Sequence, residues 1–400
     1  MLDTIDTALL AEAGDLLEES SRLRHHLHQH PELGLNLPTT QATLLEALDP
    51  LGLELRRGTS TTSITATIDG DHDGPTILLR ADMDALPMHE DTEVAFPSLD
   101  DDVMHACGHD LHVSMLVGAA KLLHARRNEL HGRVLLMFQP GEEGHHGARF
   151  MLEEGLLDGV GTVDRAFAIH ATTVAPTGFV ALKGGSVMAS ADRTLITVKG
   201  RGGHASAPHH ALDPIPIACE IVLALQMMVT RRIDVFDPGV ITIGRVTAGT
   251  TNNVIPEVAV IEGTIRAISE ATRTKLHDGI RRVAEGIAAA HGAEATVELI
   301  HGFPVTINDE HVAGEVLRIA GSLLGDDVVR RMPAPVMGSE DFSYVLQKVP
   351  GAMAFLGATP KGTNPFTAAP NHSNRVMFDE TAMPTGIALY AAMALDHLSG

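Results

Sequence analysis

The 400-residue chain contains no tryptophan, only two tyrosines and 3% aromatic residues in all. Many proteins that bind single-stranded nucleic acids stack the bases on aromatic side chains, so this scarcity argues against such a platform. Basic residues are also few, with 29 against 51 acidic residues and a formal net charge of −22. Because nucleic acids and anionic membranes attract basic proteins, we expect neither as a partner.

Cysteine is nearly absent, since Cys107 and Cys219 are the only two, and no disulfide framework is expected. The N-terminal residues have no basic segment and no long apolar core, which predicts that there is no signal peptide. No run of about 18 apolar residues occurs, so we expect no membrane-spanning helix. Together these absences favour a cytoplasmic protein, and that reducing compartment would keep Cys107 available as a thiolate.

The length of the chain exceeds what one hydrophobic core usually supports, so we expect two domains. In the first part, helical and extended hydrophobic patterns alternate. Helices are expected over residues 5–29, 40–51, 109–130 and 147–154, and strands over 63–68, 76–80, 133–138 and 163–170. Between the first two strands, a turn is expected at residues 69–75. This alternation predicts an α/β domain with a mixed, mostly parallel sheet sandwiched by helices.

The pattern changes within residues 189–301, where the expected order of elements is β-α-β-β-α-β. Strands are predicted at 193–198, 239–246, 257–267 and 294–300, and helices at 213–230 and 270–291. This order is ferredoxin-like and predicts an inserted α+β domain. The α/β pattern then resumes, with helices at 309–324, after residue 342 and at 379–398, and a strand at 352–356. Residues 1–188 and 302–400 are therefore predicted to form one discontinuous domain.

A metal site is indicated by residues at the ends of the predicted strands. Cys107 and His109 lie just before a helix; a thiolate with an imidazole suits zinc, and imidazole with carboxylate also admits manganese. Glu142 and Glu143 follow an apolar strand, so that one carboxylate can bind metal while its neighbour takes a proton from water. His170 ends a third strand. Because ligands of parallel sheets bind beyond the carboxyl ends of the strands, these side chains are expected to converge.

Taken singly, these patterns have simpler explanations. A C-x-H pair is more often incidental than a site, and adjacent glutamates usually form a solvated corner, but their occurrence at several strand ends weakens both explanations. Asp82 and Asp84 follow another buried strand, where carboxylates are costly unless they are paired or near a cation. We expect a functional role for Asp84, whereas Asp82 could cap a turn. His30 is expected at the surface or outside the ligand set.

Together the motifs resemble the co-catalytic metallopeptidase family of aminoacylases, carboxypeptidases and N-acyl-amino-acid amidohydrolases, and more narrowly its hippurate hydrolase and auxin-conjugate hydrolase branch. The motifs span nearly the whole chain in the order His28–Gly34, Arg80–Pro87, Cys107–Asp110, Gln139–Gly144, His170, Gly203–Ala205, Asn253–Pro256, Glu340–Phe342 and His372. The resemblance implies two divalent metal ions, Mn²⁺ or Zn²⁺ or else Co²⁺ or Ni²⁺. It also implies a homodimer or higher homo-oligomer in which the inserted domain serves as a lid and dimerisation domain.

The resemblance also assigns roles to single residues. The implied metal ligands, among which the cysteine takes a bridging position, are Cys107, His109, Glu143, His170 and His372. Glu142 is implied as the general base, and Asp84 as the carboxylate that orients a ligand. His204 is implied to reach the active site of a partner subunit and to stabilise the oxyanion there. Asn253 and Arg266 are implied to hold the carboxylate of the substrate.

The implied activity is metal-dependent hydrolysis of N-acyl amino acids to a carboxylic acid and a free amino acid. A dipeptidase or carboxypeptidase-like activity is the alternative, but no acidic residue is singled out to hold a free α-amino group. Cys107 as a covalent nucleophile with His109 as its base is a poorer hypothesis, because it leaves the glutamate pair unused. A non-catalytic binding protein would be expected to lack a ligand or the base, and none is missing. Departures at Ala171–Thr173 and His145–His146 affect the expected acyl preference rather than the reaction.

Overall fold

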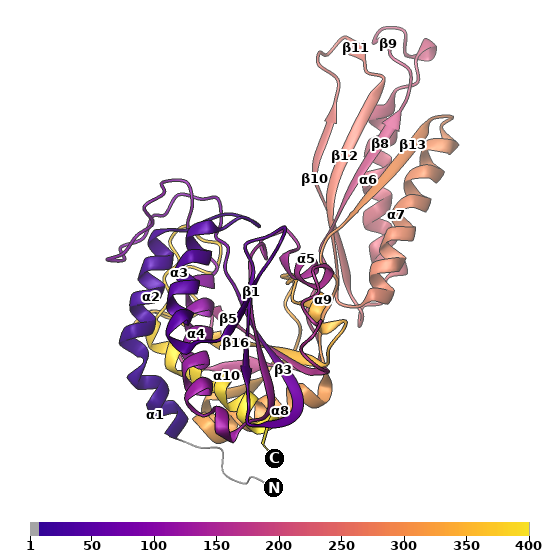
Figure 1. Ribbon diagram of the computed structural model, residues 1–400. Helices are drawn as coiled ribbons and strands as arrows, with labels where there is room; N and C mark the ends of the chain where they lie inside the picture. The colour runs from indigo at the N-terminus through magenta and orange to yellow at the C-terminus, as the bar shows by residue number, and fades with distance from the viewer. Residues whose placement is uncertain (1–7, 400) are drawn as a thin grey trace. The chain divides into compact units, whose positions relative to one another are not determined.

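The computed structural model of the protein describes residues 8–399, and the chain forms two compact units (Figure 1). The first unit comprises the chain up to Gly185 together with 307–334 and 341 onwards, and the inserted unit comprises 186–306 and 335–340. The inserted unit thus extends beyond the predicted 189–301 at both ends. It also takes up a short separate segment that no local pattern indicated. Residues 5–7 of the first predicted helix lie outside the described residues.

The first unit is built on an eight-stranded sheet in the order β1-β2-β4-β3-β5-β16-β6-β15. Its strands are β1 (Glu54–Arg57), β2 (Ile64–Asp69), β3 (His72–Asp82), β4 (His131–Gln139), β5 (Val163–Thr172), β6 (Val180–Leu182), β15 (Val329–Arg331) and β16 (Gly351–Gly357). The four central strands, β4, β3, β5 and β16, are parallel, whereas β2 joins β4 in antiparallel orientation. Their apolar runs are buried, as expected for parallel strands covered on both faces. The predicted mixed, mostly parallel α/β sheet is confirmed.

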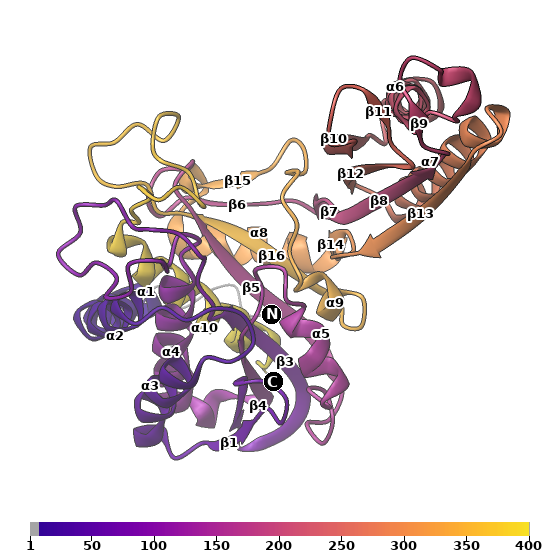
Figure 2. The same cartoon turned by 90° about the horizontal axis from the view of Figure 1, so that it is seen from above.

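Helices cover both faces of this sheet (Figure 2). The α-helices are α1 (Ala8–Asp15), α2 (Leu17–Gln29), α3 (Pro38–Leu48), α4 (His109–Ala125), α5 (Gly147–Glu153), α8 (Glu310–Leu324), α9 (Ser343–Leu346) and α10 (Met383–His397). Single 3-10 turns occur at η1 (Asp49–Leu51), η2 (Arg127–Glu129), η4 (Asp326–Val328) and η5 (Glu380–Ala382). α4 and α10 pack against each other and against β3 and β5, while α5 packs against β4 and α9.

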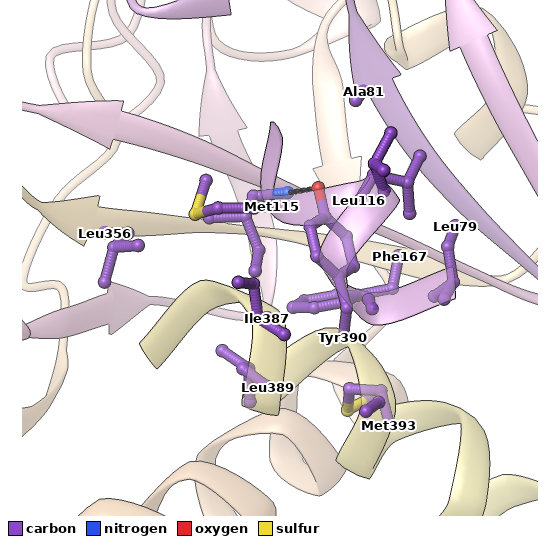
Figure 3. Packing of buried hydrophobic residues seen from close by; sticks show 14 of the residues in the cluster. Leu79, Ala81, Met115, Leu116, Phe167, Leu356, Ile387, Leu389, Tyr390 and Met393 are labelled. Atoms are coloured by element: carbon purple, nitrogen blue, oxygen red, sulfur yellow. Dashed lines mark hydrogen bonds between the residues drawn. The ribbon is translucent and has the colours of Figure 1, made fainter. Parts of the chain in front are cut away.

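The hydroxyl group of Tyr390, on α10, bonds to both β3 and β5 where their shared ladder ends, and Figure 3 shows the ring of Tyr390 among the buried apolar side chains. The last paired residues of the two strands are Arg80 and Ala168. Beyond them, Tyr390 Oη donates to the carbonyl of Arg80 (2.7 Å) and accepts the N–H of Ile169 (3.1 Å). The backbone groups stay satisfied although the strands no longer bond to each other. This arrangement ends the pairing of β3 with β5 just before the carboxyl edge of the sheet.

Several predicted boundaries differ from the structure. The first predicted helix is divided into α1 and α2, with Leu16 between them. The turn expected at 69–75 is shorter, because β3 already begins at His72, which pairs with His131 of β4. Glycine is required in this tight turn, since a Cβ atom at Gly70 would lie 2.0 Å from a backbone oxygen. The helix predicted to reach residue 130 ends earlier and continues as η2.

The inserted unit contains a four-stranded antiparallel sheet in the order β10-β12-β8-β13. Its main elements are β8 (Asp192–Lys199), α6 (Pro214–Arg232), β10 (Gly239–Ala248), β12 (Val258–Ala267), α7 (Glu270–Ala290) and β13 (Glu294–His301). The first strand of this series lies between the third and the fourth, which is the ferredoxin-like arrangement. The remaining short elements are β7 (Gly185–Met188), β9 (Gly203–His204), η3 (Pro208–His210), β11 (Val254–Ile255) and β14 (Thr306–Asn308).

Within residues 8–399, α6 is the one helix whose length and hydropathy would allow it to cross a membrane. Its inner face carries Ile217, Ile221 and Leu225, which belong to the hydrophobic core of the inserted unit. Core helices of soluble proteins meet the same two criteria, so this property is weak evidence for a membrane span.

Candidate metal centre

Cys107 and His109 are placed by the loop that leads into α4. His109 is the first residue of the helix, and Gly108 before it has a left-handed backbone conformation (φ +86°). A Cβ atom at Gly108 would also lie 3.2 Å from the ring of Phe378, so glycine meets both the conformational and the spatial requirement. Both flanking side chains are buried and their ligand atoms lie within 4.8 Å of each other. The turn therefore brings the thiol and the imidazole to one point.

Glu142 and Glu143 follow β4 in a turn that Asp84 holds from beyond the end of β3. The carboxylate of Asp84 accepts the N–H of Glu142 at Oδ1 (2.9 Å) and the N–H of Glu143 at Oδ2 (3.0 Å). Asp84 is fully buried, and its main-chain carbonyl accepts the Nδ1–H of His109 (2.7 Å). A single residue thus orients the backbone of both glutamates and the ring of a histidine.

All five predicted ligands belong to the first unit and converge beside the carboxyl edge of its sheet. Their ligand atoms form two groups that share the thiol of Cys107: one adds His109 and His170, and the other adds Glu143 and His372. Within each group all ligand atoms lie within 4.8 Å of one another. In the first group Cys107 Sγ lies 3.5 Å from His170 Nε2, and in the second Glu143 Oε1 lies 3.1 Å from His372 Nε2. The chain therefore assembles one connected set of sulfur, nitrogen and oxygen donors.

The environment of His109 fits a bound cation. Its Nε2 atom is buried and forms no hydrogen bond, although Asp82 Oδ2 lies 3.4 Å away, and a buried polar atom without a hydrogen bond is costly unless something compensates it. The same atom lies 4.0 Å from Glu143 Oε1. The ligand atoms of His109, Glu142 and Glu143 also all lie within 4.8 Å of one another. A donor set of thiolate, imidazole and carboxylate suits divalent transition metals such as zinc and manganese. The residues present therefore fit the two divalent ions that the sequence predicted.

The pKa shifts within the cluster also favour a metal site. Burial raises the pKa of the Cys107 thiol, and the neighbouring charge of Glu143 raises it further. Burial alone would lower the pKa of His109, but the charges of Asp82 and Cys107 hold it well above its usual range. Without a cation, these groups would therefore retain protons that bound metal would displace. Burial and the nearby His112 lower the pKa of His170 to about 3, which keeps that imidazole neutral, as a ligand must be.

Asp82, for which capping of a turn was the simpler alternative, pairs instead with two buried side chains. Its Oδ2 accepts a hydrogen bond from the buried guanidinium of Arg80 (2.7 Å), and its Oδ1 lies 2.5 Å from His112 Nδ1. His112 Nε2 in turn accepts the N–H of Ala171 (2.7 Å). Sequence reasoning gave His112 no role, although its spacing of three residues from His109 places both on one face of α4. His30 is only partly buried and belongs to neither ligand group described above, as expected.

The remaining predicted site residues, His204, Asn253 and Arg266, lie in the inserted unit. His204, on β9, is paired with Val254 of β11, and the main-chain carbonyl of Asn253 accepts the N–H of Ala205 (3.1 Å). His204 and Asn253 are thus brought together on one exposed two-stranded ribbon. Arg266, on β12, is half-buried, and its Nη1 atom has no hydrogen-bond partner. Burial lowers the pKa of this guanidinium, which would favour an anionic partner.

Comparison with protein families identifies the family of the chain, because the model of the peptidase family M20/M25/M40 matches residues 78–396. The chain belongs to this family. It is 39% identical over 378 residues to thermostable carboxypeptidase 2 of Saccharolobus solfataricus, with 94% of each chain covered. It is 38% identical over 400 residues to the IAA-amino acid hydrolase ILR1-like 2 of Arabidopsis thaliana, covering 98% of this chain and 89% of that protein.

A solved structure from the same family places the metal chemistry on the same fold. It is a dinuclear metal-binding M20 peptidase from Bacillus subtilis, which is 34% identical, superposes with a TM-score of 0.83 and covers 96% of this chain and 99% of its own. Membership in the M20 family confirms the predicted resemblance. The protein is accordingly a metal-dependent amidohydrolase, and its donor set is that of a site for two divalent ions.

Proposed function

We propose that this M20 enzyme hydrolyses the linear amide bond of N-acyl amino acids and releases a carboxylic acid and a free amino acid. The observation that carries the proposal is the position of Glu142, whose carboxylate reaches the ligand atoms of His109 and Glu143 within 4.8 Å. Asp84 holds the backbone of both glutamates, so that one carboxylate can serve as a ligand while its neighbour stays available for proton transfer. The sequence relatives include enzymes named for the hydrolysis of acylated amino acids.

Glu142 would act as general base and then as general acid. Its carboxylate accepts a proton from the water molecule whose oxygen attacks the amide carbon, and it returns that proton to the amine nitrogen as the C–N bond breaks. When bound, the two divalent ions lower the pKa of water and polarise the amide carbonyl. Cys107, His109, Glu143, His170 and His372 would hold these ions, for which we propose Mn²⁺ or Zn²⁺, with Co²⁺ or Ni²⁺ as substitutes.

The residues of the inserted unit would bind the rest of the substrate. Arg266 offers a planar guanidinium that matches a carboxylate, and its unpartnered Nη1 atom supports this role. Asn253 would assist in holding the same carboxylate. His204 would donate to the oxygen that becomes negatively charged in the transition state, a contact typically worth about 3 kcal/mol. We assign His204, together with Asn253 on the same ribbon, to the active site of a partner subunit.

The proposal is tested by measuring amine release from a panel of acetyl-, benzoyl-, longer acyl- and indole-acetyl amino acids. Protein stripped with a chelator should be inactive, and activity should return when Mn²⁺, Zn²⁺, Co²⁺ or Ni²⁺ is added, because the attacking water needs a cation. The metal that restores the highest rate identifies the preferred ion. Simple dipeptides serve as controls, since a carboxypeptidase-like or dipeptidase activity would favour them. If metal-bound protein released no amine from any of the acyl amino acids, the proposal would be overturned.

We further propose a homodimer or higher homo-oligomer formed through α6 and β10. β10 is an edge strand, and Leu223 and Met227 on α6 are 72% and 62% exposed. The side chain of Gln226, between them, donates to the carbonyl of Ile241 on β10 (3.2 Å). The exposed apolar side chains of α6 therefore lie next to the unpaired edge of β10. Both are surfaces that a second copy of the chain could cover.

Light scattering after size exclusion tests this assembly. The native protein should have the mass of a dimer or larger, and Leu223→Glu should shift it to a monomer, because a buried unpaired carboxylate is costly. Arg282→Glu, which places the same side chain on the exposed face of α7, should leave the mass unchanged. A native monomer would also remove the basis for His204 acting in a partner's site.

We also propose a cytoplasmic location without nucleic-acid or membrane partners. A buried free thiol that serves as a metal ligand is best preserved in a reducing compartment, and Cys107 is such a thiol. The net charge of −22 disfavours binding to nucleic acids and anionic lipids. Cell fractionation tests the location: recovery of the enzyme in a membrane or extracellular fraction would contradict it.

A further inference from the structure

The side chain of Asn371 connects the chain segments that carry three of the five ligands. Asn371 lies between β16 and η5, directly before His372. Its amide nitrogen donates to the carbonyl of Cys107 (3.1 Å) and to the carbonyl of Ala171 (2.9 Å), the residue after His170. The same nitrogen lies 3.9 Å from Cys107 Sγ, so the two hydrogens of the amide serve two carbonyls and also face the thiol. No motif or local pattern in the sequence singled out this residue.

The carbonyl of Ala171 accepts a second hydrogen bond, which comes from Nδ1 of His170 (2.9 Å). An imidazole that donates through Nδ1 keeps its lone pair on Nε2, and this is the atom that lies 3.5 Å from Cys107 Sγ. The carbonyl thus sets both the tautomer and the direction of the His170 ring. Outer hydrogen bonds of this kind are what orient histidine ligands toward metals.

The Ala171 peptide is held from both sides. Its N–H donates to Nε2 of His112 (2.7 Å), and Nδ1 of His112 is paired with Asp82. On the carbonyl side, Asn371 also bonds to the main chain of the Cys107 loop, whereas His170 approaches the thiol of Cys107. Asn371 therefore links the backbone that carries the thiol to the peptide that orients the His170 ring.

We propose that Asn371 is a positioning residue of the metal centre, which fixes the His170 imidazole and the Cys107 thiol relative to each other before metal binds. This inference rests on the proposed ligand roles of these two residues. The next residue, His372, is also a proposed ligand. Its backbone has a left-handed conformation (φ 68°), which is unfavourable for a residue with a side chain. The N–H of His372 donates to Ala106 (2.8 Å), so the same loop is held at two consecutive residues.

The test is Asn371→Asp, which keeps the size of the side chain but places only acceptors opposite two carbonyl oxygens. Metal affinity is measured by competition of Zn²⁺ and Co²⁺ with a chromophoric chelator, and the cobalt form is examined by absorption spectroscopy. We expect metal binding about 10- to 100-fold weaker, with altered thiolate-to-cobalt charge-transfer bands. The sign is informative, because an added negative charge near cations would by itself strengthen binding.

Asn374→Asp is the matched control, since it adds the same charge three residues away at an exposed position, and it should leave affinity and spectrum unchanged. If Asn371→Asp does not fold, as judged by circular dichroism of the metal-free form, Asn371→Ser retains one donor and is measured instead. Unchanged affinity and spectrum in the folded variant, tighter binding, or an equal loss in Asn374→Asp would overturn the proposal. Because these measurements need no substrate, they remain decisive even if the proposed acyl-amino-acid activity is not found.

Discussion

Replacing Glu142 with glutamine should lower kcat for N-acyl amino acids by about 100- to 10,000-fold, the usual contribution of a general base, and should leave metal content unchanged. Glutamine has nearly the same shape but cannot accept the proton of the attacking water. Its backbone N–H can still donate to Asp84, so the turn that carries Glu143 should be preserved. The measurement combines steady-state kinetics on the best acyl substrate with elemental analysis of the purified variant.

Glu153→Gln on α5 is a suitable control, because this glutamate is exposed and its ion pair with Arg149 spans 3.6 Å. The control should keep both its activity and its metal. Retained turnover in Glu142→Gln would assign the base to another residue. Loss of metal from Glu142→Gln would instead identify Glu142 as a ligand, and the roles of the two adjacent glutamates would then have to be exchanged.

Four of the five proposed ligands lie beside a recognisable local element of the sequence, whereas His372 lies in a loop and was assigned by the family resemblance alone. Cys107 and His109 lie at the start of a helix, the glutamate pair follows an apolar strand, and His170 lies near the end of another. Parallel strands bring such ends to one edge, so short patterns sufficed to expect that they meet. The same logic predicted the mixed parallel sheet and the ferredoxin-like order of the inserted unit.

The groups that hold the ligands could not be predicted in this way, because their partners are distant in sequence. Tyr390 bonds to strands more than 200 residues away, and nothing in its own helix indicates this. Asn371 likewise acts through the main-chain carbonyls of remote residues. The early start of β3 depends on pairing with β4, which local turn signals at residues 69–75 cannot reveal. Such contacts are properties of the folded chain rather than of a local pattern.

Replacing Asp84 with alanine should weaken metal binding about 10- to 100-fold and lower turnover together with it. The substitution removes the acceptor for two backbone N–H groups, those of Glu142 and Glu143, in a fully buried place. A buried donor left unsatisfied costs about 1–3 kcal/mol, so the turn should relax and Glu143 should lose its orientation. The main-chain carbonyl of Asp84 remains, so the bond to His109 Nδ1 is expected to survive. Isothermal titration with Zn²⁺ measures the affinity.

The substitutions of Glu142 and Asp84 distinguish proton transfer from metal binding, two functions that we assign to glutamates adjacent in the sequence. Glu142→Gln should remove proton transfer and spare the metal, whereas Asp84→Ala should affect both, because one carboxylate holds the backbone of both glutamates. Asp102→Ala, at an exposed position, controls for the loss of a carboxylate and should change neither quantity. If Asp84→Ala bound metal normally and lost only turnover, Asp84 would act on Glu142 alone. The shared hydrogen bonds would then orient the base without supporting the ligand beside it.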